Sequence, residues 1–329
     1  MDKNLLYFPY INIPNTNWTT QSILYWDKVG IIVPDEFRFN PDKFEPYTVE
    51  LLKSDLIEGM YLGQHYYDLR NIEKIFFNLL KSDQLNLSKL QQNFREENYL
   101  KIYREKFYVS LLKKLIDLDL AKLNPKDQST ILIEYNTSKI LMFYLATTLS
   151  FIENYTVSTD KTEFLNLNID NNSDGIKLND IRQNLIGELI PYPIKPNLSK
   201  LRKFKDKFHK ELDSFRILIE KYAYDISILP YEEQMEEKQK IIIDEILDKK
   251  EMIISELKSN RLGEISFGTI CGITSTIGGI SSGNYLFGSL ALAGTLYNEV
   301  KNTNEKFKIL KQKDFSYIAL IDKKFKTVS

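Results

Sequence analysis

Cysteine and histidine are almost absent from this sequence of 329 residues. Cys271 is the single cysteine, and His65 and His209 are the two histidines. An intramolecular disulfide is therefore excluded, as is a structural zinc site of four sulfur and nitrogen ligands. The first residues, Met1 to Asn4, also lack the basic segment and the long apolar run of a signal peptide. We therefore expect a reducing, cytoplasmic location.

Net charge is missing as well. Lys and Arg number 44, Asp and Glu number 45, and the formal net charge is -1. Such a balanced chain has no global field that would attract nucleic acid, so we do not expect nucleic acid as a partner. The apolar share of 43% and the charged share of 27% are typical of globular proteins. The length exceeds that of most single cores and predicts two domains.

Short apolar runs and helical patterns alternate in the first two-thirds of the chain. The runs 5–13 and 29–33 flank a helical pattern that starts at Trp18, which predicts a βαβ unit. Pro9 lies inside the first run and favours a strand at or near an edge of the sheet. Further strands are expected at 57–62, 131–135 and 187–191, with helices at 71–81, 99–120 and 138–153. Residues 1–196 are thus predicted to form an α/β domain with a short, mostly parallel sheet.

The pattern changes after Pro196, the last of three prolines within six residues. Large apolar residues from Phe204 to Ile226 recur every three or four positions, which predicts one long helix. Pro230 ends it, and a second long helix is expected over 231–258. The apolar run 315–321 is read as a strand. We predict a helical domain over 197–329, so the whole chain is of the α+β or α/β class and mainly helical.

Residues 265–298 contain no charged side chain and hold 7 of the 13 glycines. A split near 278–283 leaves two arms of about 22 Å if helical, which is short of a ~30 Å hydrocarbon core. The stretch therefore predicts a helical hairpin with small residues at the spacing that lets helices approach closely. The hairpin residues that we expect at its contacts and turn are Gly268, Gly272, Gly279, Gly283, Ser289 and Ala293.

Three roles stay open for this hairpin. It can pack against the long helices of its own chain, associate with another protein or a second copy, or contact a membrane. Lys258, Arg261 and Lys301 flank both ends and are compatible with a peripheral position at a membrane.

Two familiar motifs fail at this hairpin. Residues 279–283 spell G-x-S-x-G, but no histidine follows the serine, as the hydrolase triad requires. The glycines of 278–283 have P-loop spacing, but Asn284 and Tyr285 stand where the lysine and the Mg²⁺-binding hydroxyl are needed. We therefore expect neither a serine hydrolase nor a P-loop nucleotide site, and we expect no cofactor.

Weaker candidates for catalysis remain. Arg202 and His209 have a spacing that resembles the R-x4-6-H motif of HEPN-family ribonucleases, and on one helix they would share a face. That resemblance implies a base and a charge stabiliser for RNA cleavage. Carboxylates near strand ends could instead hold Mg²⁺ for a phosphodiesterase, namely Asp27, Asp35, Glu36, Asp160 and Glu163. For both sets the competing interpretation is a solvated surface.

Several short motifs resemble an uncharacterised bacterial family, domain of unknown function 6236. They are the opening Tyr7-Phe8-Pro9-Tyr10-Ile11, then Leu24-Tyr25-Trp26-Asp27 and Leu189-Ile190-Pro191-Tyr192-Pro193, and the segment from Phe204 to Arg216. The resemblance implies a bacterial, cytoplasmic accessory protein but supplies no activity.

We therefore favour a non-enzymatic interaction or effector protein, of a phage-defence or mobile-element kind, whose hairpin mediates assembly or membrane contact. The alternatives are the ribonuclease or metal-dependent phosphodiesterase and a structural scaffold domain.

Overall fold

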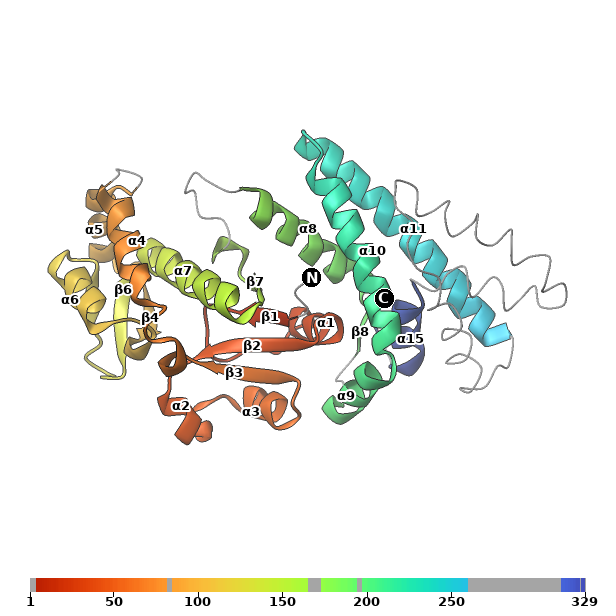
Figure 1. The fold of residues 1–329 in the computed structure, drawn as a ribbon, viewed down its shortest axis with the longest axis horizontal. Coiled ribbons are helices and arrows are strands. Elements are labelled where there is room, and N and C mark those ends of the chain that lie inside the picture. Colours follow the sequence, from red (N-terminus) through yellow and green to blue (C-terminus); the bar gives the residue numbers. More distant parts are fainter. Residues whose placement is uncertain are drawn as a thin grey trace. The chain divides into compact units, whose positions relative to one another are not determined.

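A parallel sheet of four strands forms the centre of the first part of the chain in the computed structural model (Figure 1). The structure describes residues 4–81, 85–164, 173–193, 197–259, 315–325 and 327–328. Contacts between Cα atoms divide the chain into two units, Met1–Ile176 and Lys177–Ser329. The boundary thus precedes the predicted one near Pro196, a residue that lies outside the described part.

The sheet has the order β3-β2-β1-β7, and all of its pairs are parallel. Its strands are β1 (Asn4–Tyr7), β2 (Lys28–Val33), β3 (Ile57–Tyr61) and β7 (Thr156–Ser158). Helix α1 (Asn17–Tyr25) connects β1 to β2, which confirms the predicted βαβ unit.

The first strand was predicted at or near an edge, and it lies next to the edge strand β7 but not at the edge itself. β1 lies inside the sheet, between β2 and β7. The strand ends at Tyr7, so Pro9 follows it and removes no donor from the ladder.

The other elements of the first unit form a second layer and connections. The short helices are α2 (Glu36–Phe39), η1 (Pro41–Lys43), α3 (Pro46–Lys53), η2 (Leu62–His65), η3 (Arg104–Lys106) and η4 (Thr162–Phe164). The longer ones are α4 (Arg70–Lys81), α5 (Leu87–Arg95), α6 (Val109–Asp117) and α7 (Tyr135–Glu153). Helix α7 packs against β1 and β7. The predictions for α4 and α7 are confirmed.

Residues 99–120 do not form the predicted helix. They contain β4 (Tyr99–Tyr103), then η3 and α6. β4 joins an antiparallel sheet of order β4-β6-β5 with β5 (Ala121–Leu123) and β6 (Thr130–Glu134). Aromatic and β-branched residues in β4 suit a pleated sheet, and pairing with the fully buried β6 overrides the helical spacing of apolar residues.

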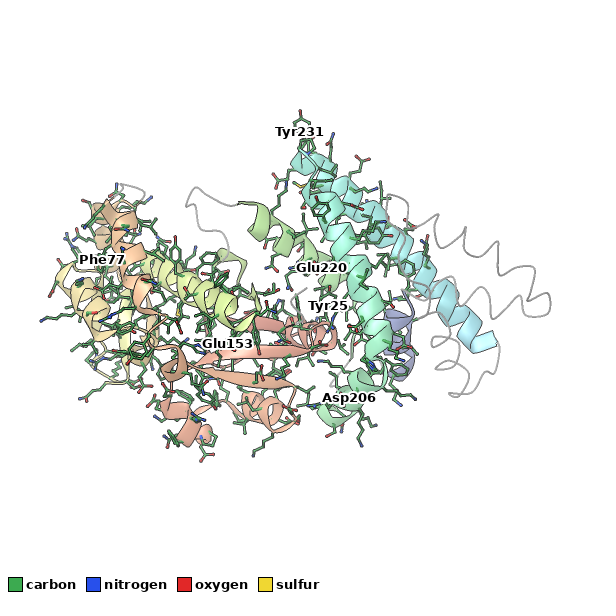
Figure 2. The ribbon with its side chains drawn as sticks, viewed as in Figure 1. Tyr25, Phe77, Glu153, Asp206, Glu220 and Tyr231 are labelled. Carbon is green, nitrogen blue, oxygen red and sulfur yellow. The ribbon has the colours of Figure 1, made fainter. Side chains whose placement is uncertain are left out.

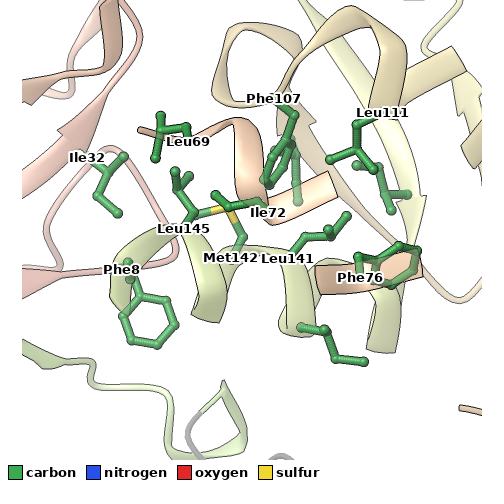
Figure 3. Close-up of a cluster of buried hydrophobic side chains, with 14 of the residues drawn as sticks. Phe8, Ile32, Leu69, Ile72, Phe76, Phe107, Leu111, Leu141, Met142 and Leu145 are labelled. Atoms are coloured by element: carbon green, nitrogen blue, oxygen red, sulfur yellow. The ribbon is translucent and has the colours of Figure 1, made fainter. Parts of the chain in front are cut away.

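One hydrophobic cluster joins the two sheets of the first unit (Figure 3). Ile32 contributes from β2, Phe8 from the position after β1, Phe76 from α4, Leu111 from α6 and Leu141 from α7. Leu111 is 1% exposed, and the other four side chains are 0% exposed. Burial of each contributes about 1.5–3 kcal/mol to folding.

The second unit is helical. Its elements are α8 (Ser173–Leu189, which begins before the unit boundary), α9 (Leu198–Lys207), α10 (His209–Ser227), α11 (Glu232–Ser259) and α15 (Ser316–Lys324), with a small antiparallel pair of β8 (Tyr192–Pro193) and β9 (Thr327–Val328). The ion pair of Lys250 Nζ with Asp322 Oδ2, at 3.0 Å, links α11 to α15. The second long helix, predicted over 231–258, is confirmed as α11.

Three predictions in this region are wrong. Residues 187–191, predicted as a strand, include the end of α8. The helix expected from Phe204 to Ile226 is divided into α9 and α10 at Phe208, whose φ of -114° and ψ of 29° are not helical. The apolar run 315–321 forms most of α15, because a run of contiguous apolar residues fits a buried helix as well as a buried strand.

The predicted class is confirmed: a mainly helical α+β or α/β chain with a parallel sheet at the N-terminus and a helical C-terminal region. The predicted glycine-rich hairpin lies outside the described residues.

Candidate functional site

The four parallel strands end at one edge of the sheet, which we call the carboxyl edge. Pro9 follows β1, Asp35 follows β2, Gly63 follows β3 and Asp160 follows β7. The chain runs from β1 to β2 to β3 in one direction and then returns to the other side of β1. Ligands of open α/β sheets bind outside the carboxyl ends of the strands, near such a reversal. The carboxyl edge is therefore the first place to look for a site.

A pocket of about 60 Å³ lies at the carboxyl ends of β2 and β3, and we call it the edge pocket. Leu62, Phe107 and Leu111 give it an apolar surface. Its polar residues are the carboxylates Asp35, Glu73 and Glu105, the phenols Tyr66 and Tyr108, and Lys106. A water needs roughly 10–15 Å³ by a comparable measure, so the pocket has room for about four waters.

Lys106 is the most unusual side chain of the edge pocket, because it is only 3% exposed. Its Nζ donates a hydrogen bond to the carbonyl oxygen of Pro9 at 2.8 Å. That partner is neutral, and burial lowers the pKa of the amine to about 7. The amine of Lys106 thus exists in both protonation states near neutral pH.

Tyr108 and Gly63 shape the same pocket. The ring of Tyr108 lies 4.3 Å from the ring of Tyr66, and its hydroxyl oxygen is buried without a hydrogen-bond partner among the described residues. Burial raises the pKa of Tyr108, and the neighbouring Tyr66 adds to the effect. A Cβ on Gly63 would lie 2.5 Å from Asp35 Oδ2, so a larger residue there would displace the carboxylate from its present position.

Neither Lys106 nor Tyr108 was found from the sequence. We predicted a helix over 99–120, and on such a helix Lys106 would be one more charged surface residue. The available signal was the aromatic pair Phe107-Tyr108 next to it, which is common in ordinary cores.

The predicted carboxylates are divided between the two edges of the sheet. Asp160 and Glu163 follow β7 at the carboxyl edge, whereas Asp27 precedes β2 and lies at the opposite edge. Asp160 Oδ1 accepts a hydrogen bond from the Tyr7 hydroxyl at 3.1 Å, and its Oδ2 lies 3.5 Å from Lys161 Nζ. Within the described ranges, no three His, Cys, Asp or Glu residues are grouped to hold a metal ion.

Arg202 and His209 lie on different helices. Arg202 belongs to α9, and His209 is the first residue of α10. Arg202 Nε lies 3.5 Å from Asp206 Oδ2, while His209 Nδ1 lies 3.2 Å from the backbone oxygen of Asp206 (Asp206 is labelled in Figure 2). The expectation of one shared helix face is wrong, because the helix breaks at Phe208 between them.

His65, the other histidine, is buried in η2, and its Nε2 lies 3.5 Å from Glu153 Oε1. His65 is thus a packed core residue.

A second candidate surface lies on the helical unit. Ile217 and Tyr224 lie on α10, and Ile228 is the residue directly after its end. They are separated by seven and four residues, so at 100° per residue they lie within about 40° of one another around the helix axis. They are 67%, 59% and 62% exposed, and Tyr231 and Ile241 add to them from the turn and from α11. We call these five side chains the α10–α11 surface; Figure 2 shows Tyr231 where the two helices meet.

The opposite side of α10 is its core side. Phe215, Ile219, Ala223 and Ile226 are fully buried there. The side opposite the core thus carries the exposed Ile217, Tyr224 and Ile228, with Lys221 among them.

The predicted hairpin residues Gly268, Gly272, Gly279, Gly283, Ser289 and Ala293 lie outside the described part, as does Cys271. In the part that is described, no helix is both long and apolar enough to cross a membrane.

Comparison of the chain with protein-family models, with curated proteins and with solved structures finds no match. The resemblance to the uncharacterised bacterial family stays a prediction.

Proposed function

We propose that this chain is a non-enzymatic interaction or effector protein that binds a partner protein through the α10–α11 surface. The observation that carries the proposal is the stripe of Ile217, Tyr224 and Ile228 opposite the buried side of α10. Lys221 lies between Ile217 and Tyr224 on the same face, so the stripe contains one charged residue. Single exposed apolar residues are normal on a protein surface, whereas several on one helix face are typical of an interface.

The α10–α11 surface is small, which determines how many further contacts a partner must make. Complete burial of one large apolar side chain contributes about 1.5–3 kcal/mol, and these five are already partly covered. Association costs roughly 4–15 kcal/mol because both partners lose translational and rotational freedom, and the five side chains together contribute a free energy of the same order. A stable complex therefore needs further contacts around the stripe.

Charge at the start of α11 indicates the chemistry of those contacts. Glu232, Glu233, Glu236 and Glu237 are exposed and begin next to Tyr231. A partner with an apolar centre and lysines or arginines at its rim fits this arrangement, and opposite charges at a rim mainly accelerate association. A second copy of the chain is one source of such a partner. Assembly or membrane contact through residues 265–298 stays a prediction.

The test is a pair of matched substitutions. Ile217→Lys with Tyr224→Lys places two charges in the stripe without touching the core side of α10. Phe151→Lys is the control, because Phe151 is 89% exposed on α7 in the other unit. Self-association is measured by analytical ultracentrifugation, and other partners by capture from lysate of the source cells followed by identification of the retained protein.

We expect the double variant to lose association by at least tenfold in Kd and the control to keep it. The proposal is wrong if both variants bind like the wild type, or if the wild type neither self-associates nor retains a partner. Loss of binding in a variant lacking residues 265–298 but not in the double variant would assign the contact to the hairpin instead.

A further inference from the structure

We propose that helix α9 binds the phosphate backbone of a nucleic-acid duplex through a row of exposed lysines. Lys200, Lys203 and Lys207 form this row, which we call the α9 lysine row. It shares no residue with the α10–α11 surface, and Figure 2 shows Asp206 of α9 and Tyr231 at opposite ends of α10. The nucleic-acid proposal therefore succeeds or fails independently of the protein-binding proposal.

The lysine row lies on one side of α9. Its members are three and four positions apart, so at 100° per residue they fall within about 60° of one another around the helix axis. All three lysines are exposed, and Lys200 and Lys207 are separated by about 10 Å along the axis. Three positive charges thus face solvent in a row along the helix.

Helix α9 holds these lysines on a packed support. At its start the Asn197 side chain accepts a hydrogen bond from the Lys200 N–H at 3.0 Å, which caps the helix. On its buried side, the ring of Phe204 lies 5.6 Å from the ring of Tyr317 and 5.4 Å from that of Phe325. The backbone positions of the lysine row are therefore set before a ligand arrives, which lowers the entropic cost of binding.

The positive charge of the lysine row is not neutralised by its own helix. Five of the ten residues of α9 are Lys or Arg, and Asp206 is its single acid. Arg202 occupies that acid, because its Nε lies 3.5 Å from Asp206 Oδ2. Within the described ranges no lysine of the row forms an ion pair, and Lys207 Nζ lies 5.3 Å from the centroid of the Phe208 ring. The net charge of -1, from which we expected no nucleic-acid partner, is an average over the chain that conceals this local concentration.

Two further exposed lysines lie next to the row. Lys210 is in the first turn of α10, three positions after Lys207. Lys324 ends α15 directly before Phe325, whose ring contacts Phe204 of α9. An extended polyanion can therefore meet more of these charges than a single phosphate ion can.

The surroundings of the lysine row select among polyanions. Protein interfaces have an apolar core, and amphipathic helices enter a membrane surface with an apolar face. No large apolar residue is exposed on α9, because Leu198, Leu201 and Phe204 are buried. A duplex requires no apolar contact, because lysine contacts with phosphates supply essentially all of its sequence-independent binding. Single strands are bound with the help of stacked aromatic side chains, which the exposed side of α9 lacks.

The experiment measures binding of the full-length protein to a fluorescein-labelled DNA duplex of mixed sequence. Fluorescence anisotropy gives the Kd at salt concentrations from about 50 to 200 mM. The test variant carries Lys200→Gln, Lys203→Gln and Lys207→Gln. The matched control carries the same change at three exposed lysines of the first unit, namely Lys53, Lys113 and Lys126. Both variants lose the same net charge, so they separate a local contact from the charge of the whole chain.

We expect the wild type to bind with a micromolar Kd at about 50 mM salt and the test variant to bind at least tenfold more weakly. The slope of log Kd against log salt should decrease by about 2.7, since each lost phosphate contact removes about 0.9. The control should stay within about threefold of the wild-type Kd, because its lysines do not touch the backbone. Absence of binding by the wild type overturns the proposal. Equal losses in the two variants also overturn it, because binding would then follow net charge alone.

Other probes separate the remaining occupants of this face. Vesicles of equimolar phosphatidylcholine and phosphatidylserine test a membrane, poly-glutamate tests an acidic protein, and sedimentation of the test variant tests the acidic start of α11 in a second copy. If the lysine row is needed for one of these contacts and not for duplex binding, the assignment to nucleic acid is wrong. Duplex RNA presents the same phosphates, so binding of either duplex through the row supports the proposal. Single-stranded DNA should bind more weakly, and tighter binding of the single strand would overturn the assignment of a duplex.

Discussion

Replacement of Lys106 by Met should make the protein more stable at neutral pH, although it removes a hydrogen bond. Met has a similar length and no charge, and it can occupy the same buried space. The change leaves the Pro9 oxygen without the donor at 2.8 Å, which costs about 1–3 kcal/mol. It also removes the cost of keeping a desolvated amine in the folded state.

The size of that second effect follows from the pKa of Lys106, which burial lowers from 10.5 to about 7. Between these pH values the unfolded chain binds the proton and the folded chain does not, so the unfolding free energy rises with pH. The penalty is largest below pH 7, about 5 kcal/mol, and disappears above pH 10.5. Between pH 7 and 9 the wild type should gain about 2 kcal/mol relative to the variant.

Urea unfolding at pH 6, 7, 8 and 9 measures this difference. We expect Lys106→Met to be more stable than the wild type by about 1–3 kcal/mol at pH 7, with an advantage that falls by about 2 kcal/mol at pH 9. Lys126→Met is the control, because Lys126 is exposed in the loop before β6 and should give a difference that does not change with pH. A pH-independent difference for Lys106→Met would refute the argument that the amine is buried without a compensating charge.

Three other substitutions test the fold. Phe76→Ala should destabilise the first unit by about 3–5 kcal/mol in urea unfolding, because Phe76 is fully buried in the cluster of Figure 3, whereas exposed Phe151→Ala should stay within about 0.5 kcal/mol. Glu97→Gly should raise the melting temperature slightly, with a gain of about 0.5 kcal/mol, because the φ of Glu97 is 62° and glycine adopts this conformation without strain; a lower melting temperature would contradict this. Glu134→Ala should cost about 1–2 kcal/mol, because the fully buried Glu134 carboxylate accepts from the Thr137 N–H at 2.6 Å and caps α7. Hydrogen exchange at Thr137 should then accelerate, and unchanged exchange would argue against the cap.

Local sequence patterns were sufficient to predict those elements whose apolar residues repeat at the period of a single type of secondary structure. The βαβ start, α4, α7 and α11 have runs or spacings that match their observed structure closely. In these segments the buried positions repeat at the period of the element itself. The surroundings then reinforce a preference that the segment already has.

Patterns failed where a segment fits two structures equally. The run Phe315–Ile321 is apolar except for Ser316, so its period cannot separate a strand from a helix. In the structure it packs against α10 and α11 as α15. Residues 99–103 carry helical spacing but pair with β6. The stripe from Phe204 to Ile226 continues across a break at Phe208, so the sequence placed Arg202 and His209 on one helix and the structure does not.

The candidate sites show the same division. The sequence was sufficient to select Asp160 and Glu163 as carboxylates that follow a strand. Only the arrangement of the strands in the sheet shows that both lie at the carboxyl edge, whereas Asp27 lies at the opposite edge. Lys106 could not be selected, because nothing in its neighbours along the chain distinguishes it from an exposed lysine. Its character comes from Pro9, 97 positions away, and from the apolar side chains around it.

The sequence alone determined three properties: the scarcity of cysteine and histidine, the balanced charge, and the alternation of strand and helix patterns. The scarcity of cysteine and histidine already excluded a disulfide framework and a structural zinc site. Which carboxylates share an edge of the sheet, which lysine is buried and which apolar side chains of α10 are exposed were decided only by the tertiary structure. The physical reason is that composition and periodicity are properties of each segment by itself. Burial and desolvation, by contrast, depend on residues that are distant in the chain and adjacent in space.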